Sequence, residues 1–571
     1  MVIKDFDDIF QYIGGFGRYQ MILFGASCVL NVFVVFVYFG QMFMTLTPPH
    51  WCRAPTSLLN MNLSELELKE LTIPRHQNGR DFLSCTRYDV NFTQVVESNA
   101  SWPDPTWPVT SCTHGWTYNY SVYYPTITSE LDWVCDEDWR PALAQSLFFV
   151  GSMVGSPSLG WAADAWGRLP IIVFANLLGA LAGVASAFSS SFVMFAVLRF
   201  IVGLTYEQHY IIAYILLLEY VGSRYRTVMA NAPVMTFLTL GLCCMPWMAW
   251  GLAHWSSFAL LIHGLQVVTI LCIWVVPESA RWLLSKGRVD KALLIISRAA
   301  RINRKSLSPE VLQEFKSYAE KMGQQANQPR VTAFSLLKTP VLRRRFILVC
   351  LMWMVMTLAY DGHTRNTENV GYNAFLSFTI AGAVEFPADV LTMMATEWLG
   401  RRHTTVWSLI LSGLVALSIA LIPEESTVII MTLAFAGRFL ITMTMNVGHQ
   451  YPVEILPTVA RGQGMGTMQT LGFLSAFASP YIVYLSKFDP ALPYVILGIL
   501  TVVGGLACLF LPETLHEKLP DTLDDGETFF AGQSLCYNPC SRPKGRDPEA
   551  KDTEMTEAVG QVNLAFQDNS T

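Results

Sequence analysis

Long apolar stretches recur along this 571-residue chain, and they restrict its fold more than any other feature. A helix needs about 20 apolar residues to cross the hydrocarbon core of a bilayer. Charged residues make up only 14% of the chain, against about 25% in soluble proteins. The sequence therefore predicts an all-α membrane protein with twelve transmembrane helices, near residues 19–44, 142–163, 169–190, 192–217, 229–253, 256–276, 346–366, 372–396, 404–423, 427–450, 463–485 and 491–511.

The seventh stretch is unusual, because its apolar run FILVCLMWMVMTLA (346–359) ends early and Asp361, His363 and Arg365 follow. If this stretch spans, these charges lie at membrane depth, and Gly362 permits a break in the helix. Asp361 and Arg365 are four residues apart and can pair on one helical face. Both an ion pair in contact with water and a role in substrate binding remain open, since intramembrane charges usually face a partner or a cavity.

The two long loops differ in charge. Residues 45–141 carry 12 acidic and 6 basic residues, whereas residues 277–345 carry 5 acidic and 15 basic ones. Basic loops favour the cytosolic side. We therefore expect a cytosolic N-terminus (1–18), two six-helix halves (19–276 and 346–511) separated by a cytosolic basic loop (277–345), an extracellular loop (45–141) and a cytosolic tail (512–571). No removable signal peptide precedes the first span, and residues 526–571 are expected to be disordered.

The loop 45–141 carries two independent marks of an oxidising compartment. It holds four cysteines, an even number, which predicts two disulfides without fixing their connectivity: Cys52, Cys85, Cys112 and Cys135. It also holds four clustered glycosylation sequons: Asn62, Asn91, Asn99 and Asn119.

The two halves repeat each other at a nearly constant offset of 233 to 235 residues. The matched pairs are Arg168 with Arg401, Glu219 with Glu454, Arg226 with Arg461, and Pro277 with Pro512. This pattern predicts two six-helix halves in the same orientation, a parallel repeat typical of transporters. Short loops with Gly, Arg and an acid can form bonds across helix ends that break when the conformation changes. The plainer interpretation of each motif is charge anchoring at the membrane surface.

Specific motifs connect the chain with a known family. Gly160, Asp164, Gly167 and Arg168 form the pattern G-x-x-x-D-x-x-G-R, and PESARWLLSKGR (277–288) and LPETLHEKLPDTLDD (511–525) follow each half. With SELDWVCDEDWRPALAQSLFFVGSMVGS (129–156), the chain resembles the organic cation, organic anion and carnitine transporters of the major facilitator superfamily from about residue 15 to 525. The resemblance implies the major facilitator fold, alternating access, and small organic ions as substrates at the plasma membrane. A position in span 11 that often carries a charge in the family is Phe473 here, so neither sign is favoured.

Charges and aromatic residues within the spans are the candidate substrate ligands. Glu385, in the pattern VEFPA, lies mid-span and either contacts a cation or pairs with a base such as Arg438; Asp389 lies one turn further on. Tyr360 matches a family position that lines the cavity. Tyr210 and Tyr214, one turn apart, either help to form an aromatic box for an ammonium group or simply pack.

The combination of acids with Arg365 favours a transporter of organic cations or zwitterions. The alternative within the family is an organic anion exchanger that uses Arg365, Arg438 and the histidines. A sugar porter and a non-transporting receptor fit less well. The sequence shows no metal-ligand spacing, nucleophile motif or phosphate loop, so we expect neither an enzyme nor a cofactor, and no nucleic-acid partner. The expected partners are a small organic ion and the lipid bilayer.

Overall fold

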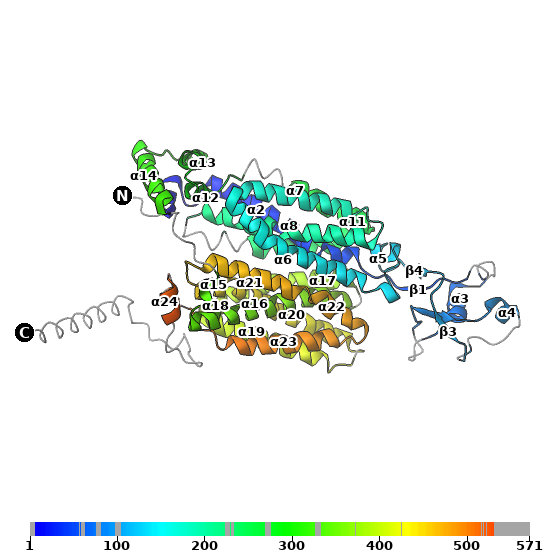
Figure 1. Cartoon of the computed structure of the whole chain (residues 1–571). Helices are drawn as coiled ribbons and strands as arrows, with labels where there is room; N and C mark the ends of the chain where they lie inside the picture. Colours follow the sequence, from blue (N-terminus) through cyan, green and yellow to red (C-terminus); the bar gives the residue numbers. More distant parts are fainter. Residues whose placement is uncertain are drawn as a thin grey trace, which may run out of the picture.

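The structure is a computed structural model, and Figure 1 gives its overall arrangement. It describes residues 6–55, 58, 63–75, 81–97, 104, 106–222, 229, 233–268, 276–325, 333–371, 373–423, 425–515, 517, 519–520 and 522–529. Two helical bundles lie one above the other in Figure 1, and helices dominate both. Two helical bundles are the arrangement that the resemblance to the major facilitator superfamily implies.

The first bundle comes from the N-terminal half. Its helices are α2 Arg18–Met44, α6 Arg140–Trp166, α7 Arg168–Ser186, α8 Phe192–Glu219, a π-helical turn η4 Val234–Leu238 that continues into α10 Thr239–Leu252, and α11 Trp255–Val268. The second bundle has α16 Pro340–Arg365, α17 Ala374–Ala383 followed by α18 Glu385–Trp398, α19 Arg401–Ile419, α20 Thr427–Ile455, α21 Arg461–Ala476 followed by α22 Ser479–Tyr484, and α23 Leu492–Cys508.

Each of the expected spans overlaps with one of these helices or with two consecutive ones, and parts of 229–253 and 256–276 lie outside the described residues. Among the described residues, seven helices are long and apolar enough to cross a membrane by length and composition. Helix α23, at Leu492–Cys508, is a shorter apolar helix. The others are broken, lie partly outside the described residues or carry more charge, as α16 does with its Arg343–Arg345 run.

Helix α16 corrects one expectation from the sequence. It runs without a break to Arg365, so Gly362 does not interrupt it. A Cβ at Gly362 would lie 2.9 Å from a methyl carbon of Leu497 on α23. Gly362 therefore permits close packing of two helices rather than a bend.

The loop between α2 and α6 folds into a small domain at one end of the bundles, seen at the right of Figure 1. Its elements are β1 His50–Cys52, α3 Glu65–Thr72, β2 Thr86–Tyr88, α4 Phe92–Glu97, β3 Val109–Ser111, β4 Trp116–Tyr118, α5 Ile127–Glu130 and η3 Cys135–Glu137. β1 pairs antiparallel with β4, and β2 with β3. Disulfides join Cys52 to Cys112 and Cys85 to Cys135. We call this end of the molecule the loop end.

The opposite end, here called the basic end, carries the helices of the 277–345 segment. They are α12 Ala280–Ser285, α13 Val289–Ile302, α14 Pro309–Gln325 and α15 Ala333–Leu336, and the N-terminal turns η1 Phe6–Asp8 and α1 Ile9–Ile13 pack with them. Helix α13 is amphipathic: Ala292, Ile296 and Ala299 are buried on one face, whereas Asp290 and Arg301 lie toward the surface.

The start of the tail is a second correction. Residues 526–529 were expected to be disordered, but they belong to or directly follow α24 Leu523–Thr528. The Glu527 carboxylate accepts the backbone N–H groups of Val341 and Leu342, both at 2.9 Å, at the start of α16. A carboxylate at a helix N-terminus satisfies unpaired donors and the helix dipole, and this contact orders the chain beyond Leu523. The rest of the tail lies outside the described residues.

Candidate functional site: a cavity between the two halves

A cavity of about 1390 Å³ lies between the two bundles. Its inner wall includes Tyr38 and Tyr206 from the first half and Tyr360 and Phe473 from the second. Towards the basic end it is lined by residues at or near helix ends, among them Asp164, Arg168, Lys286, Gln450 and Gly462. The cavity therefore extends from the middle of the bundles toward the basic end.

Aromatic side chains close the cavity at the loop end. Phe43 of α2 stacks on Phe375 of α17 with ring centres 5.8 Å apart, and it meets Phe378 edge-on at 5.2 Å. Phe39 also meets Phe378, at 5.7 Å. These contacts join the two halves in a buried apolar cluster. The structure is thus closed at the loop end and open at the basic end.

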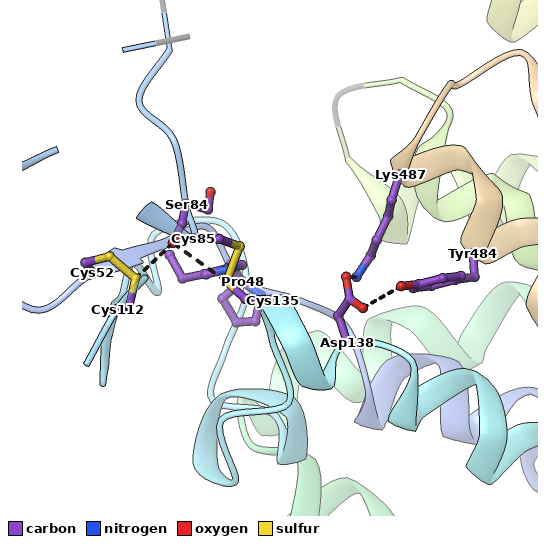
Figure 2. The surroundings of a disulfide bond; sticks show 10 residues. Pro48, Cys52, Ser84, Cys85, Cys112, Cys135, Asp138, Tyr484 and Lys487 are labelled. Atoms are coloured by element: carbon purple, nitrogen blue, oxygen red, sulfur yellow. Dashed lines mark hydrogen bonds and ion pairs between the residues drawn. A yellow bond between two sulfur atoms is a disulfide. The ribbon is translucent and has the colours of Figure 1, made fainter. Parts of the chain in front are cut away.

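A polar contact joins the halves beside the folded loop domain (Figure 2). The Tyr484 hydroxyl donates to Asp138 over 2.6 Å, and the Lys487 ammonium lies 3.0 Å from the same carboxylate. Asp138 follows Cys135 by three residues, and Cys135 is bonded to Cys85. The disulfide therefore connects the loop domain to the segment that contains Asp138. We call the contact of Asp138 with Tyr484 and Lys487 the loop-end latch.

Glu385 is engaged within the protein. It lies at the start of α18, is 3% exposed, and forms an ion pair with Arg438 of α20. The Tyr360 hydroxyl donates to Glu385 over 2.8 Å, and the Arg438 guanidinium lies 3.9 Å from the Tyr360 ring centre. The backbone carbonyl of Tyr360 also accepts from Arg438 at 2.9 Å. Arg438 therefore neutralises the charge of Glu385 and covers one face of the Tyr360 ring.

Two further buried acids line the cavity and form no direct ion pair among the described residues. Asp389, one turn after Glu385, accepts a hydrogen bond from the Asn446 amide. Glu207 of α8 faces the cavity from the other half and is 6% exposed. Its Oε2 atom has no hydrogen-bond partner in the described part of the chain. The cavity wall thus carries carboxylates on both halves.

Asp361 and Arg365 form an ion pair of 2.8 Å, but the pair is not in contact with water. Asp361 is 0% exposed. The guanidinium of Arg365 lies 5.5–5.7 Å from the ring centres of Tyr38, Phe39 and Phe149 of the first half. The pair belongs to the closed loop end, and neither residue lines the cavity in this conformation.

Arg199 of α8 was not predicted as a candidate site residue from the sequence. It is 0% exposed, and its Nε donates to Gln41 of α2 over 2.7 Å. Its Nη1 and Nη2 atoms have no hydrogen-bond partner among the described residues, and Phe148 lies 5.4 Å from the guanidinium. The sequence offered one signal, a lone arginine within an apolar run, and such a residue usually has a function at membrane depth.

The repeated motifs form matching networks at the basic end. In the first half, Arg168 pairs with Asp164 at 3.0 Å and lies 3.8 Å from Glu219. In the second, Arg401 lies 3.2 Å from Glu454. These pairs stay within one half each, and Arg461 donates to the carbonyl of Leu456.

Two acids that were not singled out from the sequence complete these networks. Glu278 accepts the backbone N–H groups of Arg168 and Leu169, and Glu513 accepts those of Arg401 and Arg402. Both follow the repeated prolines and are 235 residues apart. The offset of the repeat was therefore the signal that could have found them.

The remaining candidate residues fall into two groups. Phe473 of α21 is 8% exposed and lines the cavity, while Asn91 and Asn119 lie on the loop domain. The side chains of Tyr210 and Tyr214, together with Arg226, Asn62 and Asn99, lie outside the described residues.

Comparisons with known proteins all find transporters. The sequence family described as "Sugar (and other) transporter" matches residues 108–522. The human organic cation/carnitine transporter 2 is 31% identical over 542 residues, which cover 91% of this chain and 94% of that protein. The carcinine transporter of Drosophila melanogaster is 32% identical over 553 residues, covering 94% of this chain and 81% of that protein. The inward-open xylose transporter XylE of E. coli has a TM-score of 0.55 at 14% identity, covering 87% of this chain and 97% of that one.

Proposed function

Because this chain belongs to the organic cation and carnitine transporter family of the major facilitator superfamily, we propose that it carries small organic cations or zwitterions across the plasma membrane by alternating access. The chain is a multi-pass membrane protein of a transporter family, not of an enzyme family. The names of its relatives include organic cations, carnitine and carcinine, and this agrees with a substrate that carries a positive nitrogen.

The charge of the cavity wall carries this proposal. Glu207, Glu385 and Asp389 line its inner part, whereas the Lys and Arg residues among the described lining, Arg168 and Lys286, belong to the motifs of the basic end. Buried carboxylates lower the energy of a positive ligand at short range, since the low-dielectric surroundings strengthen the attraction.

The same geometry argues against an organic anion as the main substrate. Arg365 is paired with Asp361 behind aromatic rings, and Arg438 is paired with Glu385. Neither arginine lines the cavity. An anion that passed Arg168 and Lys286 at the basic end would therefore meet Glu207, Glu385 and Asp389 in the inner part of the cavity, where no arginine or lysine belongs to the described lining.

We propose that the loop end faces the outside and the basic end the cytosol. The sequons and the two disulfides of the loop domain favour an oxidising, glycosylating compartment. The basic residues of 277–345 favour the cytosol. Both termini are then cytosolic, and the structure represents an inward-open conformation.

The test is uptake of radiolabelled solutes in a cell that expresses the chain. A monoamine, carnitine, a histamine-type conjugate and an aromatic anion are compared with and without depolarisation. We expect saturable amine uptake that falls on depolarisation, because an inside-negative potential draws a cation inward by about 2.3 kcal/mol per charge per 100 mV.

Cells without the chain provide the baseline for each solute. Uptake of the aromatic anion that amines do not inhibit, with no amine uptake above the baseline, would overturn the proposal in favour of an anion exchanger.

A further inference from the structure

We propose that the ammonium group of the substrate binds on the N-terminal half of the cavity, at Glu207 with the rings of Tyr206 and Tyr38, and not at Glu385. This inference rests on the proposed transport of organic cations. It assigns the positive nitrogen to one wall of the cavity and to one carboxylate.

Glu207 has a buried carboxylate oxygen to which a ligand could donate a hydrogen bond. It is 6% exposed and lines the cavity, and its Oε2 has no hydrogen-bond partner among the described residues. The next residue on α8, Gln208, donates from its side-chain amide to the Ser156 carbonyl of α6 over 3.2 Å. This bond joins α8 to α6 next to Glu207 and brings no positive charge to its carboxylate. A buried charge without a counter-charge is costly, so a cation that enters the cavity gains the full attraction.

Glu385 offers less to a cationic ligand. Its carboxylate already has Arg438 as an ion-pair partner and the Tyr360 hydroxyl as a donor. A substrate ammonium would have to displace an arginine that also lies against the Tyr360 ring at 3.9 Å. The net charge of this group is close to zero, so its attraction for a cation is weaker than that of Glu207.

Two tyrosine rings line the same cavity as Glu207. Tyr206 precedes Glu207 on α8 and lines the cavity, and its ring centre lies 5.1 Å from that of Tyr38. Tyr38 also lines the cavity, from α2. Ring faces attract cations by about 0.5–2 kcal/mol each. The ring of Tyr206, and the face of Tyr38 that Arg365 does not cover, would add this attraction to that of the Glu207 carboxylate in the same cavity.

The experiment measures the concentration dependence of phenylethylamine uptake for the unsubstituted chain and for Glu207→Gln, with surface protein quantified in parallel. We expect Glu207→Gln to raise the half-saturating concentration by about tenfold or more, because a charged hydrogen bond is lost, while surface abundance changes less than twofold. Glu207→Asp keeps the charge and should restore most of the affinity. The control is Glu310→Gln on the exposed face of α14, for which we expect no change.

A second measurement leaves Glu207 intact. Ser156→Cys places a thiol on the cavity wall beside Glu207, and phenylethylamine should slow its reaction with a small thiol reagent at least twofold.

An unchanged half-saturating concentration in Glu207→Gln, or a loss of maximal rate alone, overturns the inference while the proposed function stands. The absence of amine uptake by the unsubstituted chain overturns the proposed function, and this inference with it. If Glu207→Gln does not reach the surface, a failure of phenylethylamine to protect the thiol of Ser156→Cys overturns the inference.

Discussion

Glu385 and Arg438 neutralise each other inside the second bundle. Their side chains are 4% and 2% exposed. The desolvation of two charges largely offsets the attraction of a buried ion pair, yet removing one partner strands the other charge and costs about 3–5 kcal/mol. The pair therefore constrains the structure around the cavity even where it contributes little net stability.

The first prediction follows from this asymmetry. Glu385→Gln alone and Arg438→Gln alone should each lower the apparent melting temperature of the purified protein and its abundance at the surface. Glu385→Gln combined with Arg438→Gln should recover a large part of both losses, because no unpaired charge remains. Thermal unfolding of all four proteins gives the coupling energy. Losses that simply add in the double variant would show that the two side chains act independently.

The candidate site was only partly predictable at the level of residues. Glu385 and Tyr360 stood out because charges and aromatic residues are unusual within apolar runs, and an Arg438 partner for Glu385 was one of two alternatives. The sequence could not show which acid is paired with an arginine and which acid forms no ion pair. That depends on contacts between helices far apart in the chain, such as α18 with α20, 53 residues apart at Glu385 and Arg438.

At the level of elements, the short turn η6 Asn366–Asn369 lies at the loop end, where the two halves meet. Its Glu368 is half-buried, and the backbone of Thr47 from the first half lies close enough to interact with the carboxyl. Burial raises the pKa of the Glu368 carboxyl to about 7, although Lys487 of the loop-end latch and the Thr47 N–H both lower it. Tyr123 of the loop domain also lies close enough to interact with this carboxyl.

The second prediction concerns extracellular pH. When the loop end opens, water reaches Glu368 and its pKa returns toward about 4.3. Protonation therefore favours the closed state, and this stabilisation is lost as the pH rises through about 7. The cysteine introduced by Phe473→Cys should react faster with an impermeant thiol reagent at pH 8 than at pH 5.5. The rates are corrected for thiolate content with a second variant that carries an introduced cysteine on the surface of the loop domain.

Glu368→Gln is the matched variant, since its amide stays neutral at every pH. Its corrected labelling rate should be the same at pH 5.5 and pH 8. A pH dependence that survives in Glu368→Gln would assign the effect to another group.

The elements themselves were predictable to different degrees. The spans follow from apolar length, which the bilayer imposes on every crossing helix. The short strands β1 to β4 were not predicted, because each has only three residues and pairing depends on partners such as His50 and Tyr118, 68 residues apart. Helix α24 was missed because a polar segment became ordered through one carboxylate, Glu527, on a distant helix end.

At the level of the whole molecule, the two halves repeat a backbone device as well as a charge pattern. Gly167 has φ +120° and Gly400 has φ +85°, each at the turn before the repeated arginine. Their ψ angles are 156° and 171°, and residues with a Cβ avoid this region of backbone conformation. A Cβ at Gly167 would meet Glu278, and one at Gly400 would meet Glu513. The sequence offset of the repeat thus reflects the same turn built twice.

The last prediction tests whether the two halves behave as separate rigid bodies. Gly167→Ala and Gly400→Ala should each destabilise the protein by about 1–3 kcal/mol through backbone strain and weaken the Glu278 or Glu513 contact. The two sites share no described partner, so their effects on the apparent melting temperature should add in the double variant. Gly264→Ala, where an added Cβ meets nothing within 4 Å, is the control and should be neutral. If the losses in apparent melting temperature add, the turn in each half contributes to stability independently of the other. A loss in the double variant that differs markedly from the sum of the single losses would show that the two turns are coupled across the halves.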